Sequence, residues 1–107
     1  FLKAVVLMHS KYGEIPQNQI HNEKKKLQSA IFICLPYKES NYPLLDEYFD
    51  ALLFRLNGLN QLFMNQTEIL TLMSLLEAAR HESSFKKYRK AILDATALVD
   101  AIKECDE

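Results

Sequence analysis

The chain has 107 residues, of which 49% are hydrophobic and 25% charged, and its formal net charge is −1 at pH 7. This length fits one domain, and the balance of apolar and charged residues excludes a disordered or collagen-like chain. The near-zero charge excludes a global field that would steer the chain to nucleic acid or to an anionic membrane. We therefore expect a single helical domain over residues 1–107. Its start at Phe1, without an initiator methionine, predicts that it is excised from a larger protein.

The composition favours helices. Only two glycines and three prolines interrupt the chain, whereas Leu, Ala, Lys and Glu are plentiful. We predict an all-α fold, either a compact helical bundle or a fragment of a HEAT/armadillo-like helical-repeat protein, with about five helices. The alternative is an α+β fold in which residues 1–35 form a short N-terminal hairpin packed by about three helices.

The first third of the chain contains two apolar segments. Residues 1–12 form a short element that ends near Gly13, and both helix and strand remain open for it. Residues 17–35 begin polar and finish in an apolar, β-branched run before Pro36. A helix is the prediction for this stretch and a buried strand is the alternative. Neither segment reaches the roughly 20 apolar residues of a membrane span, so we expect no membrane anchor.

The middle of the chain predicts a helix with an apolar face. Pro43 fits its first turn, where a missing N–H costs nothing, and Gly58 predicts a stop or a bend. The apolar residues that recur at steps of three and four are Leu45, Tyr48, Phe49, Leu52 and Leu56.

The next helix is expected to begin after Asn65. The Asn65 side chain could cap it while Glu68 reaches back to the Asn65 amide, as in a capping box. The predicted buried stripe of this helix consists of Ile69, Leu72, Met73, Leu76 and Ala79.

The last helix has the most regular pattern in the chain. Ser83 or Ser84 is the predicted cap. An apolar seam follows at alternating steps of three and four, formed by Phe85, Tyr88, Ile92, Ala95, Val99 and Ile102. The seam is expected to pack against the domain's own helices, and a homo-oligomer formed through the Phe85–Ile102 seam is the alternative.

Signatures of catalysis and cofactor binding are missing from the sequence. Gly13 and Gly58 stand alone, which excludes the glycine-rich phosphate loops of nucleotide-binding proteins. His9, His21 and His81 lack the spacing of a metal site. We therefore predict no catalytic residue, no metal, no cofactor and no enzymatic activity.

The two cysteines, Cys34 and Cys105, fit neither a metal knuckle nor a redox pair. They are interpreted as free thiols of an intracellular protein, cytoplasmic or nuclear, and a single disulfide in a secreted protein is the alternative. Cys34 lies in the most apolar run, where burial raises the pKa of a thiol and makes it a poor nucleophile.

Charged residues gather in three places. Asp46, Glu47 and Asp50 lie within one helical turn, where acids complement the helix dipole and solvate the outer face, and paired carboxylates for metal or acid–base chemistry are the alternative. The two basic clusters are Lys24, Lys25 and Lys26, and Lys86, Lys87, Arg89 and Lys90. The second cluster crowds the first turns of a helix, where the dipole disfavours cations. It is either a solvated face or a contact surface for phosphates or an acidic partner.

These observations favour a non-enzymatic protein–protein interaction domain, a scaffold or adaptor of a larger assembly. The expected partner is another protein, such as a helix or peptide in an apolar groove. Because aromatic residues and Met anchor interfaces, the candidate contacts are Tyr37, Tyr42, Phe63 and Met64. The alternative is a nucleic-acid-binding helical domain that uses the clusters Lys24–Lys26 and Lys86–Lys90.

Overall fold

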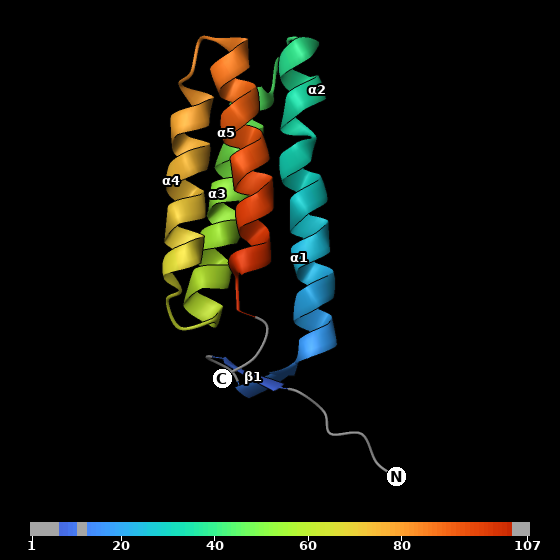
Figure 1. Ribbon diagram of the computed structural model, residues 1–107, viewed down its shortest axis with the longest axis vertical. Coiled ribbons are helices and arrows are strands. Elements are labelled where there is room, and N and C mark those ends of the chain that lie inside the picture. The colour runs from blue at the N-terminus through green and yellow to red at the C-terminus, as the bar shows by residue number, and fades with distance from the viewer. Residues whose placement is uncertain (1–6, 11–12, 104–107) are drawn as a thin grey trace.

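The computed structural model of the chain describes residues 7–10 and 13–103. In this part, a short hairpin leads into five α-helices, and the first two of these stack end to end (Figure 1). The successive helical rods run antiparallel and pack side by side. The predicted all-α helical bundle is confirmed. None of the helices among the described residues is long and apolar enough to cross a membrane.

The hairpin consists of β1 (Leu7–Ser10) and β2 (Gly13–Pro16), with Leu7 opposite Pro16 and Ser10 opposite Gly13. Gly13 has a φ of 119°, a region that L-residues with a side chain rarely adopt. The hairpin of the α+β alternative is therefore present, but it ends at Pro16. The remainder of the apolar segment at 1–12 lies outside the described residues.

The helix predicted over residues 17–35 is confirmed as α1 (Gln17–Phe32) and the start of α2 (Cys34–Glu39). Pro36 has no N–H to donate to the carbonyl of Phe32, which accounts for the interruption at Ile33. The chain nevertheless stays helical past Pro36, and the strand alternative for the apolar run is wrong.

The helix α3 (Leu45–Leu62) confirms the apolar face predicted for the middle of the chain. It begins after Pro43, which lies in the preceding turn and not in the first helical turn. The predicted stop at Gly58 is wrong because the helix continues for another turn. The neighbouring residues Asn60 and Phe63 are buried, and this packing outweighs the weak helix propensity of one glycine.

The helix α4 (Thr67–Arg80) buries the predicted stripe, with Met73 only partly covered. The capping box is wrong. Asn65 has a φ of 68° and lies in the turn before the helix, and Gln66 is the residue at the cap position. The backbone N–H of Gln66 donates at 2.8 Å to Oδ1 of Asn60, so a side chain from the preceding helix stabilises the turn.

The last helix, α5 (Phe85–Leu98), continues into a single 3₁₀ turn, η1 (Val99–Ala101). The cap at Ser84 is confirmed, since its Oγ accepts from the backbone N–H of Lys87 at 3.5 Å. The seam is buried from Tyr88 to Ile102, while Phe85 remains partly exposed. Because the seam lies inside the domain's own core, it is not available for the homo-oligomer that was the alternative.

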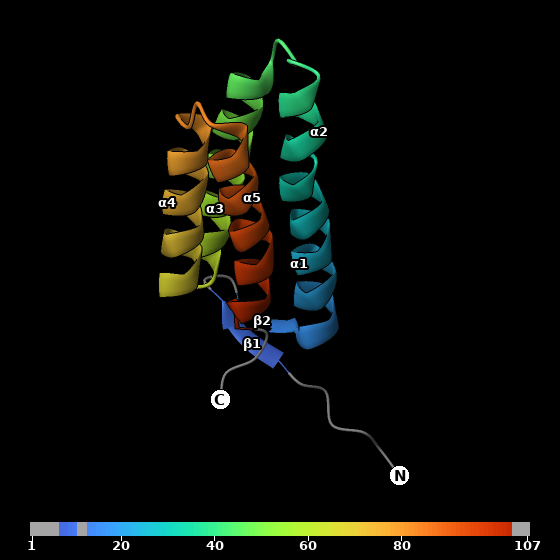
Figure 2. The ribbon, with the colours of Figure 1, turned by 45° about the horizontal axis from the view of Figure 1, so that its top comes forward.

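The core lies between the rods, with α5 beside both α4 and α1 in two views (Figures 1 and 2). Tyr88 is among the most deeply buried side chains, and its hydroxyl donates at 2.7 Å to the backbone carbonyl of Cys34. This bond joins α5 to the start of α2. At the hairpin end of the bundle, residues of α1 and α3 line a groove between them.

Candidate functional site

The four side chains predicted to contact a partner fall into two pairs. Tyr37 and Tyr42 flank the turn between α2 and α3, whereas Phe63 and Met64 follow the end of α3. The 18 residues of α3 separate the pairs by about 27 Å. The structure therefore does not bring the four together into one surface.

The first pair belongs to a cluster of tyrosines. The rings of Tyr37 and Tyr42 stack at 4.3 Å, and Tyr48 packs edge-on against Tyr37 at 5.2 Å. The Tyr48 hydroxyl donates at 2.6 Å to the carbonyl of Ala30, and burial raises the pKa of Tyr48 to about 12. These contacts close the α2–α3 turn, which supports a structural role. A partner contact at Tyr37 or Tyr42 stays a prediction.

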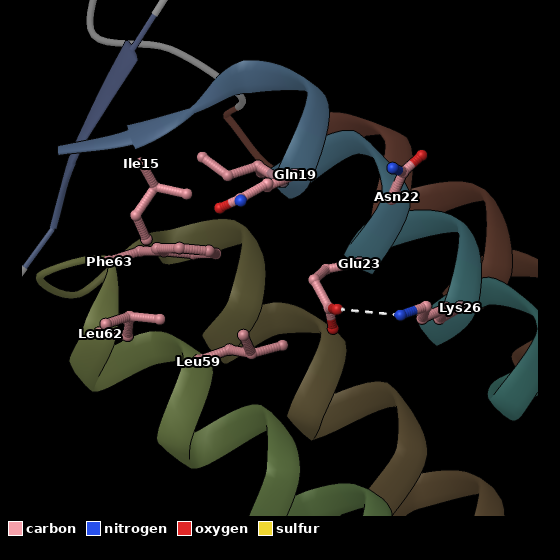
Figure 3. A pocket seen from close by; sticks show the side chains of 9 residues that line it. Ile15, Gln19, Asn22, Glu23, Lys26, Leu59, Leu62 and Phe63 are labelled. Carbon is pink, nitrogen blue, oxygen red and sulfur yellow. Dashed lines mark hydrogen bonds and ion pairs between the residues drawn. The ribbon is translucent and has the colours of Figure 1, made fainter.

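The second pair adjoins the groove between α1, β2 and α3, shown in Figure 3. The groove has a volume of about 440 Å³. Its apolar lining consists of Ile15, Ile20, Leu59, Leu62 and Phe63. Its polar lining comes from α1 and consists of Gln19, Asn22, Glu23 and Lys26. Phe63 is buried along this groove, and Met64, which is 55% exposed, follows it in the chain.

The polar rim of the groove carries charges that are already paired. The carboxylate of Glu23 lies 3.4 Å from Nζ of Lys26 and 3.5 Å from the guanidinium of Arg55 on α3. The two charged residues that line the groove, Glu23 and Lys26, offset each other, and Arg55 leaves one net positive charge beside them. Recognition in the groove must come mainly from apolar contact and from the amides of Gln19 and Asn22.

The basic cluster on α1 is not a surface patch. Lys24 is only 6% exposed, and its ammonium group donates to the backbone carbonyls of Ile102 at 2.7 Å and Asp100 at 3.0 Å. Lys26 is exposed but lies near Glu23. The prediction that Lys24–Lys26 form one contact surface is wrong for Lys24, because the carbonyls at the end of the last helix bind its charge.

The basic cluster on α5 is exposed as predicted. Lys90 pairs with Asp94 at 2.9 Å. In the part of the chain that the structure describes, no carboxylate lies within ion-pair distance of Lys86, Lys87 or Arg89. This cluster begins α5, whereas Lys24 contacts its end. Ten residues separate Lys90 from Asp100, or about 15 Å along the helix, so the two clusters do not form one surface.

The acidic residues of α3 hold a cation from α4. The guanidinium of Arg80, itself nearly buried, lies 2.7 Å from the carboxylate of Asp46 and 2.8 Å from that of Asp50. Hydrogen bonds to Asp46 and Asp50 raise the pKa of Arg80. Sequence reasoning missed this contact, because the 34 positions between Arg80 and Asp46 leave no local signal. The carboxylates therefore join two helices.

Cys34 is buried, and this burial raises its thiol pKa to about 12. The predicted burial of this residue is confirmed, and the raised pKa disfavours the thiolate, which is the reactive form. Cys34 is a free thiol in the structure, and Cys105 lies outside the described residues.

The histidines remain apart in the described ranges. His9 lies on β1 and His21 is exposed on α1, whereas Nε2 of His81 lies 3.0 Å from the carboxylate of Glu77 one turn earlier. Within residues 7–10 and 13–103, no group of three or more His, Cys, Asp and Glu residues is placed to hold a metal ion.

A second apolar depression lies on the other side of α1. It has a volume of about 410 Å³ and is lined by Gln28, Ser29, Phe32, Ile33, Pro36 and Thr96. Phe32 is 50% exposed there. Elsewhere, the largest exposed apolar side chain is Phe54, on α3 and outside both depressions.

No family model fits this chain, and no curated protein sequence or solved structure is similar to it.

Proposed function

We propose that this chain is a protein-binding module of a larger assembly that takes up an amphipathic helix of another protein in the groove between α1 and α3. The observation that supports this is the groove itself, whose apolar floor runs from Leu59 to Phe63 along one edge of α3 (Figure 3). Helix-in-groove recognition uses apolar side chains at i, i+3 or i+4, and i+7, which insert into such a floor.

The rim determines which helix fits best. Because Glu23 pairs with both Lys26 and Arg55, its carboxylate is already neutralised and a basic partner face gains little along this edge. The amides of Gln19 and Asn22 offer donors and acceptors to polar side chains that border the apolar stripe. The groove thus favours a helix with an apolar face and a neutral polar border.

A peptide selection tests this function. A displayed library of random peptides of about four helical turns is panned against the chain. We expect enriched peptides to repeat apolar residues at steps of three and four. Their affinity should fall by about tenfold in Leu62→Gln, which removes one apolar contact of the groove. It should stay unchanged in Phe54→Gln, the matched control on the exposed face of α3.

Two results would contradict the proposal. One is a selection that enriches no peptide with a helical apolar repeat. The other is a set of peptides that bind Leu62→Gln and the wild-type chain equally well. Thermal unfolding of both variants, followed by circular dichroism, shows whether either change acts through stability.

The nucleic-acid alternative is less well supported. It was based on two lysine clusters acting together, but Lys24 is buried against the end of α5 and Lys26 pairs with Glu23. Of these two clusters, the one on α5 exposes four cations and the one on α1 exposes two.

A further inference from the structure

The cations at the start of α5 form a concentrated positive surface. Lys86, Lys87 and Arg89 are exposed, and none of the described carboxylates pairs with them. The first turn of α5 contains no acidic residue. Three like charges within two turns repel one another, and an anionic ligand would relieve that repulsion.

One edge of α5 leads from these cations to the α1–α2 junction. Arg89, Leu93 and Thr96 recur at steps of four and three, so they share one edge of α5. The carbonyl of Thr96 accepts from Nε2 of Gln28 at 3.1 Å, which fixes α1 alongside this edge. Phe32 lies one turn beyond Gln28 on α1.

The apolar depression lined by Phe32, Ile33 and Pro36 lies next to this edge, because Gln28 and Thr96 also line it. Leu93 in turn lies among the cations, since it borders the same surface hollow as Lys86 and Arg89. The apolar depression and the cations are therefore joined along this edge of α5.

We infer that this surface, made of Lys86, Lys87, Arg89 and Leu93 on α5 and Phe32 and Pro36 at the α1–α2 junction, binds an acidic amphipathic segment of a protein. Carboxylates of such a segment pair with the three cations, while its apolar side chains cover Phe32 and Pro36. We call this surface the α5 face. It shares no residue with the α1–α3 groove, so the inference goes beyond the proposed function.

The surroundings favour a protein segment over nucleic acid. A phosphate backbone offers nothing to bury on Phe32, whereas an amphipathic peptide does. Asp94 lines the same hollow but is paired with Lys90, and Asp100 follows on η1, so the positive surface is short and suits a short acidic segment better than an extended polyanion. The positive surface also ends within a few turns, because Lys24 is buried.

Binding to three probes tests the inference. The first is a synthetic helical peptide of about four turns with glutamates on one face and leucines on the other. The second carries glutamines in place of the glutamates, and the third is a DNA duplex of random sequence. Fluorescence anisotropy gives the Kd of each probe at low and at moderate salt.

The main variant combines Lys86→Glu and Arg89→Glu. A matched control makes the same change in net charge at exposed lysines outside the α5 face and the groove, with Lys25→Glu and Lys103→Glu. Acids near a helix start are favoured by the dipole, so the main variant is expected to fold. Phe32→Ser tests the apolar part, and Leu62→Gln shows whether the peptide uses the groove instead.

We expect the acidic peptide to bind the wild-type chain and to lose about tenfold in affinity both in the main variant and in Phe32→Ser. Binding should persist in the control and in Leu62→Gln, and it should weaken as salt screens the charges. The glutamine peptide has the neutral polar border that suits the α1–α3 groove, so its affinity should fall in Leu62→Gln and stay unchanged in the main variant.

Several outcomes would overturn the inference. The two double variants could weaken binding equally, which would make net charge the cause. Phe32→Ser could leave the affinity of the acidic peptide unchanged, or the main variant could weaken the glutamine peptide as much as the acidic peptide. DNA could bind more tightly and be lost in the main variant, which would make the α5 face a nucleic-acid contact. Failure in any of these ways leaves the groove proposal standing, because Leu62 has no part in them.

Discussion

The ammonium group of Lys24 donates a 2.7 Å hydrogen bond to the backbone carbonyl of Ile102, 78 positions later in the chain. The same group donates at 3.0 Å to Asp100. Both carbonyls follow the last turn of α5, where a helix leaves acceptors without intrahelical donors. One buried lysine thus ties the first helix to the end of the last.

Lys24→Met should therefore destabilise the fold. Methionine keeps the apolar stem but removes the donor, so two carbonyls lose their charged partner at a cost of about 1–3 kcal/mol. Urea unfolding measures the change. Lys25→Met, at the exposed neighbouring position, is the control and should change stability by less than about 0.5 kcal/mol. Equal effects of the two substitutions would contradict the role of Lys24.

Gly58→Ala should stabilise the chain by about 0.5–1 kcal/mol, because Gly58 lies inside α3 and alanine has a higher helix propensity. A Cβ atom at this position would meet nothing within 4 Å. The midpoint of thermal unfolding should rise. Gly13→Ala is the opposite case and should be destabilising, since its φ of 119° is strained for any side chain. A lower midpoint for Gly58→Ala would show that α3 does bend there.

Alkaline pH should destabilise the fold through Cys34. Burial raises its pKa from 9.0 to about 12, so above pH 9 the unfolded state releases a proton that the folded state keeps. The stabilisation that the protonated Cys34 thiol gives the folded state is complete below pH 9. It is lost as the pH rises towards 12, at about 1.4 kcal/mol per pH unit. Tyr48, with a pKa raised from 10.0 to about 12, adds to the loss above pH 10.

The variant Cys34→Ala isolates the contribution of the thiol to this pH dependence. Its free energy of unfolding should fall by about 2 kcal/mol less between pH 8 and pH 10.5 than that of the wild-type chain. Denaturant unfolding at both pH values gives the difference. Parallel pH profiles would mean that the thiol titrates alike in both states.

Lys87→Glu should stabilise α5. Position 87 is the third after the cap Ser84, so a glutamate there completes a capping box and meets the positive end of the helix dipole. The expected gain is about 0.5–1 kcal/mol by urea unfolding. Lys25→Glu, in the middle of α1, should give no comparable gain. If Lys87→Glu lowered the free energy of unfolding, the unfavourable interaction of Lys87 with the helix dipole would be contradicted.

The amphipathic helices of the second half were predictable because their apolar residues repeat at steps of three and four. The errors arose where a distant contact outweighed a local preference. Gly58 was expected to end a helix, but packing of the residues after it continues α3. Asn65 was expected to cap α4, but Asn60 accepts from the Gln66 amide instead.

The candidate site was only partly predictable. Phe63 was singled out as an aromatic near an irregular segment, and it does line the groove. The groove also needs Ile15 and Leu62, which the chain brings together from far apart in sequence, and no local pattern reports that. Likewise, Lys24 lies in a run of three lysines, which is the pattern of a solvated face. The carbonyls that bind its ammonium group, those of Asp100 and Ile102, are more than 70 positions away, so the sequence gives no local sign of this contact.

The central claim is that a partner helix occupies the groove between α1 and α3. Amide NMR spectra of the isotope-labelled chain, recorded with and without a peptide from the selection, test it most directly. The account predicts that the largest shifts fall at Gln19, Glu23 and Leu62, around the groove. Shifts centred on the Tyr37–Tyr42 turn or on the exposed side of α4 would contradict it.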